Sequence, residues 1–555
     1  MPSFGKKDWC VRSLREQFAV RGQWWSLTFR KVDDATEPHN AVTVEHCTLR
    51  IKLHQWQIGR HDISRAIPLS SQSHIDTYET RTIFRVQATR EALVTLLETQ
   101  RRAFRQSVPA YRERNQALQK LEQAILQRKN DFVRAIADDF GGRAAEETVA
   151  LELFPVVNEI RHARRHLRRW MTPRRAPVPW QFWPARARVE YQPLGVAGIL
   201  SAWNYPLFLT LGPLVGAVAA GNHVMLKPSE LAPRSAELIA TLIADLYPPE
   251  YITVVLGDSE VAAEFSALPF DHLLFTGSGR VGKLVMRAAS ENLTPVTLEL
   301  GGKSPALIHP TYPLRRATER ILNGKLYNAG QTCVAPDYVL LPTDLKDEFV
   351  RLARQEVAAL YPRLVDNPDY TRVLNVQHYR RLADLVEEAR GTGAEVVEIN
   401  PAGETCDERN RVFPPTLLFG ASETITAMRE EIFGPVLPVV LYDRLDQAID
   451  YINARPHPLA LYYFDENGQR IRDVLARTSS GGVTVNDCVY HLGQPDLPFG
   501  GVGPSGMGQY HGFDGFETFS KKKGIFLQSR WTPLKYLQPP YGERTRRILR
   551  FILGA

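Results

Sequence analysis

Short apolar runs alternate with helical patterns along most of this chain, and this alternation constrains the fold more than any other feature. Buried strands are predicted at 196–201, 224–226, 251–255 and 272–276. A helical pattern at about 209–220 follows the first of them. Such alternation predicts parallel strands joined by right-handed helical crossovers. Because a second alternating block covers about 299–519, we expect two α/β domains with a cleft between them.

Other segments complete this predicted organisation. Residues 87–140 carry apolar side chains at helical spacing, among them Leu118, Leu121 and Ile125. Residues 186–191, which follow a proline-rich stretch, alternate in a pattern typical of an edge hairpin. The expected parts are an extension at 1–86, a first α/β domain at 87–172 and 193–298, a bridging hairpin at 173–192, a second α/β domain at 299–519 and a C-terminal arm at 520–555.

The composition indicates a large globular protein. At 555 residues the chain is too long for one core, and 44% hydrophobic and 23% charged residues are ordinary values. The net charge of +7 is small, and the arginines at 161–169 are more typical of a solvated helix face than of a nucleic-acid site. The five cysteines form no Cys-x-x-Cys pair, so we expect neither disulfides nor a metal site, as in the reducing cytoplasm.

No membrane or secretory segment is expected. Residues 1–8 are charged, and no apolar stretch of the required length follows them. Residues 192–222 carry no formal charge and are long enough to span a bilayer. However, Asn204, Pro206, Pro213 and several glycines interrupt this stretch, which favours a buried strand, a loop and a core helix.

Two polar motifs indicate covalent chemistry. The run ELGGK occupies 299–303, and NAGQTC occupies 328–333. A lone cysteine is usually buried and inert, but Cys333 lies among small and polar residues. A cysteine thiolate can attack an electrophilic carbon, and a carboxylate such as Glu299, expected at a strand end, can then activate water. A reactive thiolate at Cys333 requires a thiol pKa lowered from about 8.5.

Further motifs stand along the chain in an order shared with one family. They are SAWNYP at 201–206, KPSE at 227–230, FTGS at 275–278, EIFGP at 431–435 and PFGGVGPSG at 498–506. Together with the two motifs above, they make the chain resemble the aldehyde dehydrogenase superfamily over about 88–555. This resemblance implies a Rossmann-like NAD-binding domain, an α/β catalytic domain and a small oligomerisation hairpin.

The resemblance also implies a role for each motif. Cys333 would attack an aldehyde, the Asn204 amide and the Cys333 N–H would hold the oxyanion, and Glu299 would activate the water that hydrolyses the thioester. Glu431 would hold the nicotinamide ribose, and Phe433 would pack against the nicotinamide ring. The full set of implied cofactor residues is Lys227, Glu230, Gly277, Ser278, Gly282, Glu431 and Phe433.

The turn at 277–282, GSGRVG, spells a dinucleotide fingerprint. The acidic ribose reader of that fingerprint would fall near Glu299, which is assigned to catalysis. In the family the adenosine ribose is held from an earlier strand, here by Lys227 and Glu230, so we treat Gly279 as incidental. The Glu230 carboxylate would repel a 2′-phosphate while Lys227 softens the repulsion, so NAD is expected to be preferred and NADP tolerated.

Finer features resemble one branch of the superfamily. The SAWNYP form, the short front end and the run PPY at 539–541 resemble the dimeric class 3 group, and YHLGQPDLP at 490–498 and MGQYHG at 507–512 resemble bacterial coniferyl aldehyde dehydrogenases. The resemblance implies a homodimer and a bulky aromatic aldehyde as substrate. An aromatic substrate entrance would be lined by Trp203, Tyr205, Tyr490 and His491.

Alternatives stay open for the substrate and the reaction. A medium- or long-chain fatty aldehyde would also suit an apolar entrance. A thiol acyltransferase that passes the thioester to coenzyme A is opposed by Glu299, since a water-activating base would waste the thioester. A catalytically silent structural protein is opposed by the joint presence of Cys333, Glu299, Asn204 and Glu431.

The two ends of the chain lie outside the recognised motifs. Residues 1–86 resemble no part of the family, and their alternating pattern is limited to a brief run at 42–53. Residues 543–555 combine basic side chains with an apolar face. Contact of this tail with an anionic membrane is one reading, but docking on the enzyme or its dimer partner is the favoured one.

Overall fold

The computed structural model describes residues 13–20, 23–30, 50–53, 56–57 and 89–554. The chain divides into two compact units, Met1–Thr82 and Ile83–Ala555. The described part of the first unit is one sheet of strands in sequential order, namely β1 (Ser13–Val20), β2 (Gln23–Arg30), β3 (Arg50–Leu53) and β4 (Trp56–Gln57). Sequence patterns did not predict the antiparallel β1–β2 hairpin, and most of the alternating run at 42–53 lies outside the described residues.

The first sheet of the second unit has the strand order β19-β11-β10-β7-β8-β9. Its strands are β7 (Val196–Leu200), β8 (His223–Lys227), β9 (Ile252–Val254), β10 (His272–Thr276), β11 (Val296–Glu299) and β19 (Gly506–Met507). Strands β7 to β11 are parallel, as expected, and only the β11–β19 pair is antiparallel in this sheet. The crossover helices are α6 (Pro206–Ala220), α7 (Pro233–Leu246), α8 (Ser259–Ser266) and α9 (Gly279–Ser290).

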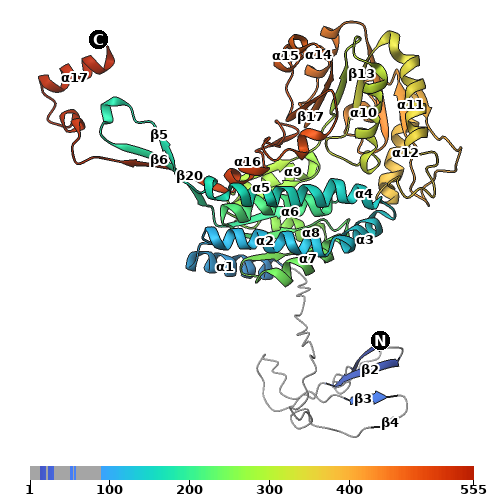
Figure 1. The fold of residues 1–555 in the computed structure, drawn as a ribbon, viewed down its shortest axis with the longest axis horizontal. Coiled ribbons are helices and arrows are strands. Elements are labelled where there is room, and N and C mark those ends of the chain that lie inside the picture. Colours follow the sequence, from blue (N-terminus) through green and yellow to red (C-terminus); the bar gives the residue numbers. More distant parts are fainter. Residues whose placement is uncertain (1–12, 21–22, 31–49, 54–55, 58–88, 555) are drawn as a thin grey trace, which may run out of the picture. The chain divides into compact units, whose positions relative to one another are not determined.

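The helices before the first sheet lie beside it in Figure 1, the first of them on the face of α8 and α9 and the later ones on the face of α6 and α7. They are α1 (Arg90–Gln106), α2 (Tyr111–Gln127), α3 (Lys129–Phe140), α4 (Ala145–Thr148), the π-helical turn η2 (Val149–Leu153) and α5 (Phe154–Trp170). Helix α6 packs against both α2 and α5, and every one of its residues is buried. This helix begins at Pro206, earlier than the predicted 209–220, because proline suits the first helical turn.

The second sheet has the order β14-β15-β16-β13-β12-β17-β18, parallel except for β14–β15. Its strands are β12 (Pro305–Ile308), β13 (Tyr338–Pro342), β14 (Glu395–Glu398), β15 (Thr416–Phe419), β16 (Val436–Tyr442), β17 (Ala460–Phe464) and β18 (Gly482–Val485). The accompanying helices are α10 (Leu314–Leu326), η4 (Tyr327–Gly330), η5 (Thr343–Leu345), α11 (Lys346–Leu360), α12 (Val376–Gly391), α13 (Thr426–Arg429), α14 (Leu445–Asn453), α15 (Gly468–Arg477) and η6 (Tyr490–Gly493).

After the second sheet the chain returns to the first. Strand β19 pairs with β11, placing Gly506 opposite Glu299. Helix α16 (Gly512–Thr518) then packs against α6 and α5. The late part of the predicted 299–519 block thus contributes to the sheet that bears Glu299.

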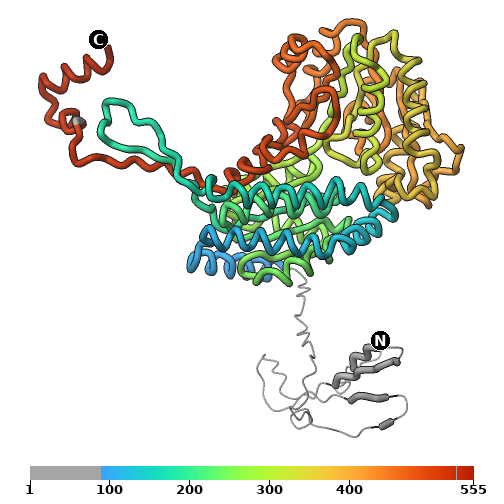
Figure 2. The backbone as a smooth tube through the Cα atoms, viewed as in Figure 1, coloured from blue at the N-terminus to red at the C-terminus, as the bar shows by residue number. Residues whose placement is uncertain are grey.

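A three-stranded sheet forms an arm from two distant segments, which run side by side in green and red in Figure 2. Its strands are β5 (Arg174–Ala176), β6 (Arg186–Pro193) and β20 (Ser520–Leu527), in the order β20-β6-β5. The predicted hairpin is present, since β5 and β6 pair antiparallel, but β20 pairs along the whole length of β6 and makes it the central strand instead of an edge strand. The short turns η3 (Trp180–Phe182) and η7 (Pro533–Leu537) and helix α17 (Glu543–Leu553) complete the arm.

The uncharged stretch at 192–222 resolves, as expected, into a strand, a loop and the core helix α6. Within the described part of the chain, every helix is too short or too polar to cross a membrane.

Candidate active site

The predicted site residues stand at strand ends of both large sheets. In the first sheet they follow parallel strands, whose carboxyl ends share one edge, and they are Asn204, Lys227, Gly277 and Glu299. In the second sheet they precede adjacent parallel strands, with Cys333 before β13 and Glu431 before β16. The site therefore combines the carboxyl edge of one sheet with the amino edge of the other.

A strained turn precedes Cys333. Asn328 and Ala329 have φ angles of 53° and 50°, in the left-handed region that non-glycine residues rarely adopt. Gly330 follows with φ 76°, and a Cβ there would lie 2.3 Å from the Gly434 carbonyl oxygen. The backbone thus packs too closely for a side chain at Gly330, and the turn delivers Cys333, half-buried, into the loop before β13.

Asn204 is tied directly to the Cys333 loop. Its side chain is buried, and Nδ2 donates to the Gln331 carbonyl at 3.2 Å. In return, Asn328 Nδ2 donates to the Asn204 carbonyl at 2.9 Å. Since an amide carries two N–H groups, Asn204 has a second N–H to donate next to the loop that carries Cys333.

Glu299 is a buried carboxylate without hydrogen bonds. It ends β11, it is 3% exposed, and neither of its oxygens has a partner among the described residues. Burial raises the pKa of its carboxyl well above the ordinary range. Because buried polar groups are nearly always paired, this arrangement is typical of a group that binds water or takes up a proton during a reaction.

The structure contradicts the expected lowered pKa of the Cys333 thiol. Burial, together with the charges of Glu431 and Glu299, raises this pKa to about 12, although the amides of Cys333 and Val334 oppose the rise. The thiol is therefore protonated here near neutral pH. A neighbouring base must take its proton before Cys333 can act as a nucleophile.

Glu431 lies against the turn that follows Glu299. A Cβ at Gly301 would lie 2.0 Å from Glu431 Oε2, so this position has no room for a side chain. Glu431 Oε1 is buried, and the described chain offers it no hydrogen-bond partner. Burial and the charge of Asp337 raise the pKa of Glu431 to about 8. An acceptor oxygen is thus left open beside the Cys333 loop.

Sequence reasoning missed the ion pair that holds the Glu431 loop. Lys303 Nζ lies 2.5 Å from Asp337 Oδ2 and donates to the Glu430 carbonyl at 3.2 Å. Asp337 Oδ1 accepts from the Ile432 N–H at 3.0 Å. The available signals were Lys303, the last residue of ELGGK, and Asp337, four residues after NAGQTC.

The cofactor residues predicted in the first sheet form two groups. The fully buried Lys227 donates from Nζ to Glu230 Oε2 at 3.2 Å. At the β10–α9 turn, Ser278 Oγ caps α9 by accepting from the Val281 N–H. The other backbone N–H groups in the first turn of α9 are suited to donate hydrogen bonds to a phosphate.

The glycines of this turn differ in how much space surrounds them. A Cβ added at Gly277 would lie 2.5 Å from the Phe275 ring, and one added at Gly282 would lie 2.8 Å from Leu300. At Gly279 it would meet nothing closer than 4.0 Å. Packing therefore requires glycine at 277 and 282, and a side chain fits at 279.

The four predicted entrance residues have different neighbours. Trp203 contacts Phe433, with ring centroids 5.3 Å apart, and so lies beside a predicted cofactor residue. The buried Tyr205 bonds Thr332 Oγ1 at 2.6 Å. Tyr490 is 53% exposed, and its hydroxyl lies 3.4 Å from that of Tyr327, a residue that sequence reasoning missed. His491 Nδ1 lies 2.9 Å from Thr484 Oγ1, which turns the ring toward β18.

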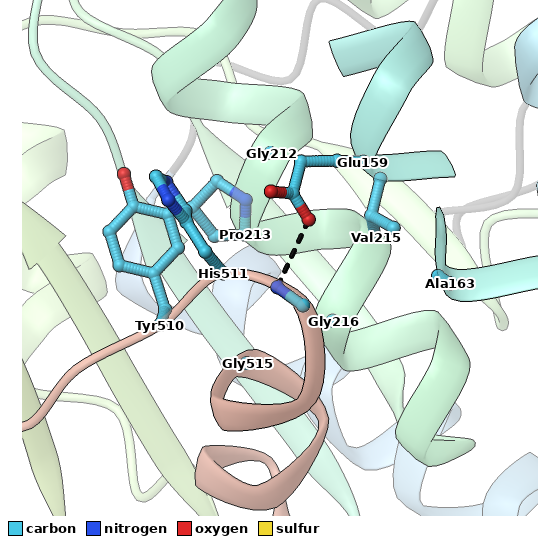
Figure 3. A pocket seen from close by; sticks show the side chains of 10 residues that line it. Glu159, Ala163, Gly212, Pro213, Val215, Gly216, Tyr510, His511 and Gly515 are labelled. Atoms are coloured by element: carbon cyan, nitrogen blue, oxygen red, sulfur yellow. Dashed lines mark hydrogen bonds between the residues drawn. The ribbon is translucent and has the colours of Figure 1, made fainter. Parts of the chain in front are cut away.

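A small cavity beside α5 and α6 contains further polar groups that the sequence did not reveal (Figure 3). Glu159 accepts from the Gly512 N–H at 3.0 Å, and Tyr510 and His511 line the same cavity. The Tyr510 hydroxyl and both His511 ring nitrogens lack partners in the described structure. Burial and the charges of Glu299 and Cys333 raise the pKa of Tyr510, so the cavity adjoins the residues around Glu299.

Comparison with known proteins extends these observations. The family model described as "Aldehyde dehydrogenase family" matches residues 69–525, beginning earlier than the resemblance noted from residue 88. A Pseudomonas aeruginosa protein named "Probable coniferyl aldehyde dehydrogenase" is 48% identical over 458 residues, covering 82% of this chain and 95% of that protein. The chain belongs to the aldehyde dehydrogenase family.

Two solved structures share the fold. Substrate-bound AldH from Staphylococcus aureus has a TM-score of 0.78 and 38% identity, and the match covers 82% of this chain and 99% of that one. An aldehyde dehydrogenase from Mycobacterium tuberculosis, complexed with NAD⁺, has a TM-score of 0.73 and 26% identity, covering 80% and 92% of the two chains. The predicted fold class and family are thereby confirmed.

Proposed function

We propose that this enzyme oxidises an aldehyde to its carboxylate, with NAD as oxidant, through a covalent adduct on Cys333. The observation that carries the proposal is the buried Glu299, whose two oxygens lack partners in the described chain and whose charge acts on Cys333. Membership of the aldehyde dehydrogenase family supports the same reaction.

In the first step, Cys333 Sγ bonds to the aldehyde carbon, its proton moves to Glu299, and the carbonyl oxygen becomes an oxyanion. Glu299 suits this role because its pKa is raised toward that of the thiol. The open N–H of Asn204 and the Cys333 N–H donate to the oxyanion. Glu299 then releases its proton and is ready for the second half of the reaction.

The chain's own residues fit NAD at three places. The first-turn amides of α9, with open space over Gly279, suit the phosphates, and Lys227 with Glu230 suits the adenosine ribose. Glu431 Oε1, an acceptor left open among the described residues, suits a ribose hydroxyl. When bound, NAD supplies the acceptor for the hydride that converts the adduct into a thioester. The NAD⁺ in the Mycobacterium tuberculosis relative supports this choice.

Hydrolysis of the thioester completes the cycle. Glu299 takes a proton from water, the water oxygen bonds to the acyl carbon, and the carbon–sulfur bond breaks. The carboxylate product leaves, and Cys333 takes up a proton again. The burial of Glu299 serves this step because its carboxylate is not committed to another hydrogen bond of the described structure.

For the substrate, we propose an aromatic aldehyde of the coniferyl type. The name of the Pseudomonas aeruginosa relative supports this class, as does the half-exposed Tyr490, whose hydroxyl with that of Tyr327 could bind a phenol. The contacts of Trp203 and Tyr205 do not add to this support, since both rings are engaged elsewhere. Fatty aldehydes of medium or long chain are the second candidate.

Initial rates of reduced-cofactor formation test both the reaction and the substrate. We expect kcat/KM to fall in the order coniferyl aldehyde, benzaldehyde, octanal and acetaldehyde, and to be higher with NAD than with NADP. The highest value for acetaldehyde would contradict the aromatic site. Adding coenzyme A should leave the product a free acid, whereas formation of an acyl-coenzyme A would identify a thiol acyltransferase.

We also propose that the enzyme is a cytoplasmic homodimer joined through the arm. The arm exposes large apolar side chains, which is typical of a surface that a partner covers, and among them are Trp180, Trp183, Phe526 and Trp531. Light scattering on the full-length chain tests this, with a dimer expected. A shorter chain ending at residue 527 should shift the mass toward the monomer.

A further inference from the structure

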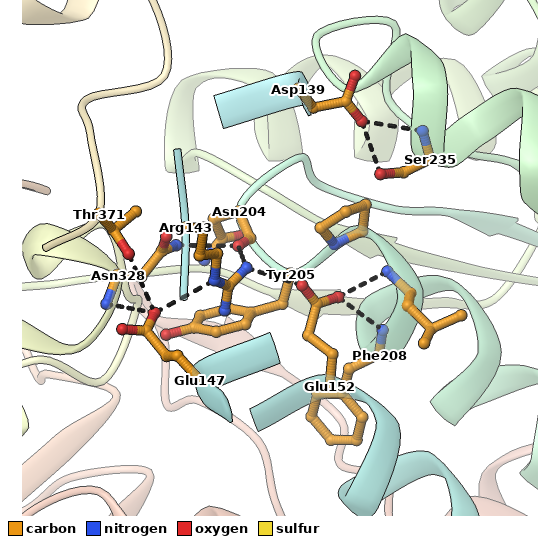
Figure 4. Close-up of polar contacts among 12 residues, drawn as sticks. Asp139, Arg143, Glu147, Glu152, Asn204, Tyr205, Phe208, Ser235, Asn328 and Thr371 are labelled. Atoms are coloured by element: carbon orange, nitrogen blue, oxygen red, sulfur yellow. Dashed lines mark hydrogen bonds and ion pairs between the residues drawn. The ribbon is translucent and has the colours of Figure 1, made fainter. Parts of the chain in front are cut away.

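A cluster of charges underlies the candidate active site, with two of its three members fully buried, and it consists of Arg143, Glu147 and Glu152 (Figure 4). The exposed fractions of these side chains are 0%, 9% and 0%. Arg143 Nε lies 3.1 Å from Glu147 Oε1, and its Nη1 lies 2.7 Å from Glu152 Oε1. We call these three residues the Arg143 network. They lie in and before the π-helical turn η2, outside the motifs quoted above.

One carboxylate of the network holds the segment that carries Asn204. Glu152 Oε2 accepts from the Leu207 N–H at 2.8 Å and from the Phe208 N–H at 3.3 Å. These amides belong to the first turn of α6, where no intrahelical acceptor exists. Glu152 therefore fixes the start of the helix that follows Asn204.

The other carboxylate holds the strained turn before Cys333. Glu147 Oε1 accepts from the Asn328 N–H at 2.9 Å. Asn328 is one of the residues with a left-handed backbone, and its side chain donates to the Asn204 carbonyl. Since such a turn persists only where its surroundings hold it, Glu147 stabilises the conformation that presents Cys333.

Arg143 joins the two carboxylates and also touches the Asn204 segment. Its guanidinium lies over the Tyr205 ring, 4.8 Å from the centroid, and its Nη1 donates to the Asn204 carbonyl at 3.5 Å. The charges of Glu152 and Glu147 keep the pKa of Arg143 raised despite its burial. The guanidinium fork can bond both carboxylates at once, which a single ammonium group cannot reproduce.

We propose that Arg143 is a positioning residue for the reaction at Cys333, acting through Glu147 and Glu152 to fix Asn204 relative to the thiol. The inference rests on the proposed oxyanion role of Asn204. Misplacement of a reacting group by about 1 Å can cost about 100-fold in rate, so a small shift between these two segments suffices to slow the reaction.

Arg114 provides a matched control at the other end of the same helix. It is also buried, and its Nη1 donates to the Ala219 and Ala220 carbonyls at 3.1 and 2.7 Å. These carbonyls end α6, whereas the Arg143 network holds its beginning. Removing either arginine takes a buried guanidinium from α6, but only Arg143 bonds the Asn204 carbonyl and, through Glu147, the turn before Cys333.

The first experiment compares Arg143→Met, Arg143→Lys and Arg114→Met in the full-length chain at a temperature where circular dichroism shows each to be folded. We expect the single-turnover acylation rate to fall about 100-fold in Arg143→Met and about 10-fold in Arg143→Lys. It should stay within about twofold in Arg114→Met, and the affinity for NAD should be unchanged in all three. Equal losses in Arg143→Met and Arg114→Met would overturn the proposal.

The second experiment combines Arg143→Met with Asn204→Ala. If Arg143 acts through Asn204, the double variant should be no slower than Asn204→Ala alone. Multiplied losses would overturn the proposal. If Asn204→Ala retains the wild-type rate, the oxyanion role of Asn204 is refuted. The comparison of Arg143→Met with Arg114→Met is separate and tests the positioning role of Arg143. Should Arg143→Met fail to fold, Arg143→Lys carries the same cycle, and a wild-type acylation rate in that variant would contradict the proposal.

Discussion

Two buried acidic clusters lie close to one another in this enzyme, and they differ in whether their carboxylates are hydrogen-bonded. In the Arg143 network, both carboxylates bond the guanidinium and backbone amides. Around Cys333, both oxygens of Glu299 and one of Glu431 find no partner in the described structure. Burying an unpaired carboxylate costs several kcal/mol, which pairing offsets. The first cluster therefore stabilises the fold, whereas the carboxylates of the second remain able to bind water or exchange protons.

The difference also appears in what each cluster can do with a proton. Burial raises the pKa of Glu152 to about 7 while Arg143 and two amides oppose the rise. For Glu299, burial acts alone and raises the pKa well above the ordinary range. A carboxyl that is not held by donors can exchange protons with a thiol or a water, whereas Glu152 would lose its helix contacts in doing so.

The largest effect is expected at the nucleophile. Cys333→Ala should remove all measurable aldehyde oxidation, because no other group can form the covalent adduct. Cys406→Ala is the matched control, since Cys406 is also half-buried and free of a disulfide. It should retain the wild-type rate of reduced-cofactor formation. Turnover by the Cys333→Ala protein would refute the covalent mechanism.

The next effect in size concerns the unpaired carboxylate. Glu299→Gln should slow steady-state turnover by about 10²–10⁴-fold, because an amide cannot take a proton from water. Rapid mixing should still show the thioester accumulating, at a reduced rate, before hydrolysis. Glu122→Gln removes a buried carboxylate that is paired with Arg161 and Arg164, and it should leave turnover within about twofold. An unchanged rate in Glu299→Gln would place the base elsewhere.

A smaller effect is expected from pH. Both Cys333 and Glu299 have raised pKa values and must lose a proton to act. The value of kcat/KM should therefore rise from pH 6 to pH 9 without an acidic optimum. In the Arg114→Met control the profile should keep the same shape. A maximum near pH 6 would show that the thiol is already ionised there, against the burial that raises its pKa.

Much of the fold could be predicted because buried parallel strands are short apolar runs. Strand β10 matches its predicted bounds, and β7 and β8 differ only at their ends. The β1–β2 hairpin was missed because Arg21 and Gly22, the two residues between its strands in the sequence, are not one of the common hairpin signals. The central position of β6 was missed because its partner β20 lies more than 300 residues later, beyond any local pattern.

Motifs in the sequence propose the residues of the site, but they do not predict its electrostatics. The thiol pKa of Cys333 depends on burial and on Glu431, which folding brings from a distant loop. Arg143, Glu147 and Glu152 carry no motif, and charges at this spacing usually mark a solvated helix surface. Their burial follows from the packing of η2 and α5 against α6, which no single segment encodes.

The most direct test of the contrast between the two clusters is the stability of Glu299→Gln and Arg143→Met against pH. A carboxyl whose folded pKa is raised makes stability fall as pH rises from about 4.5 toward that pKa, by up to about 1.4 kcal/mol per pH unit. At pH 8 the midpoint of thermal unfolding should therefore rise in Glu299→Gln. It should fall in Arg143→Met, by the equivalent of about 3–5 kcal/mol, because two carboxylates lose their partner. Both differences should shrink at pH 5, and a lowered midpoint for Glu299→Gln at pH 8 would contradict the account.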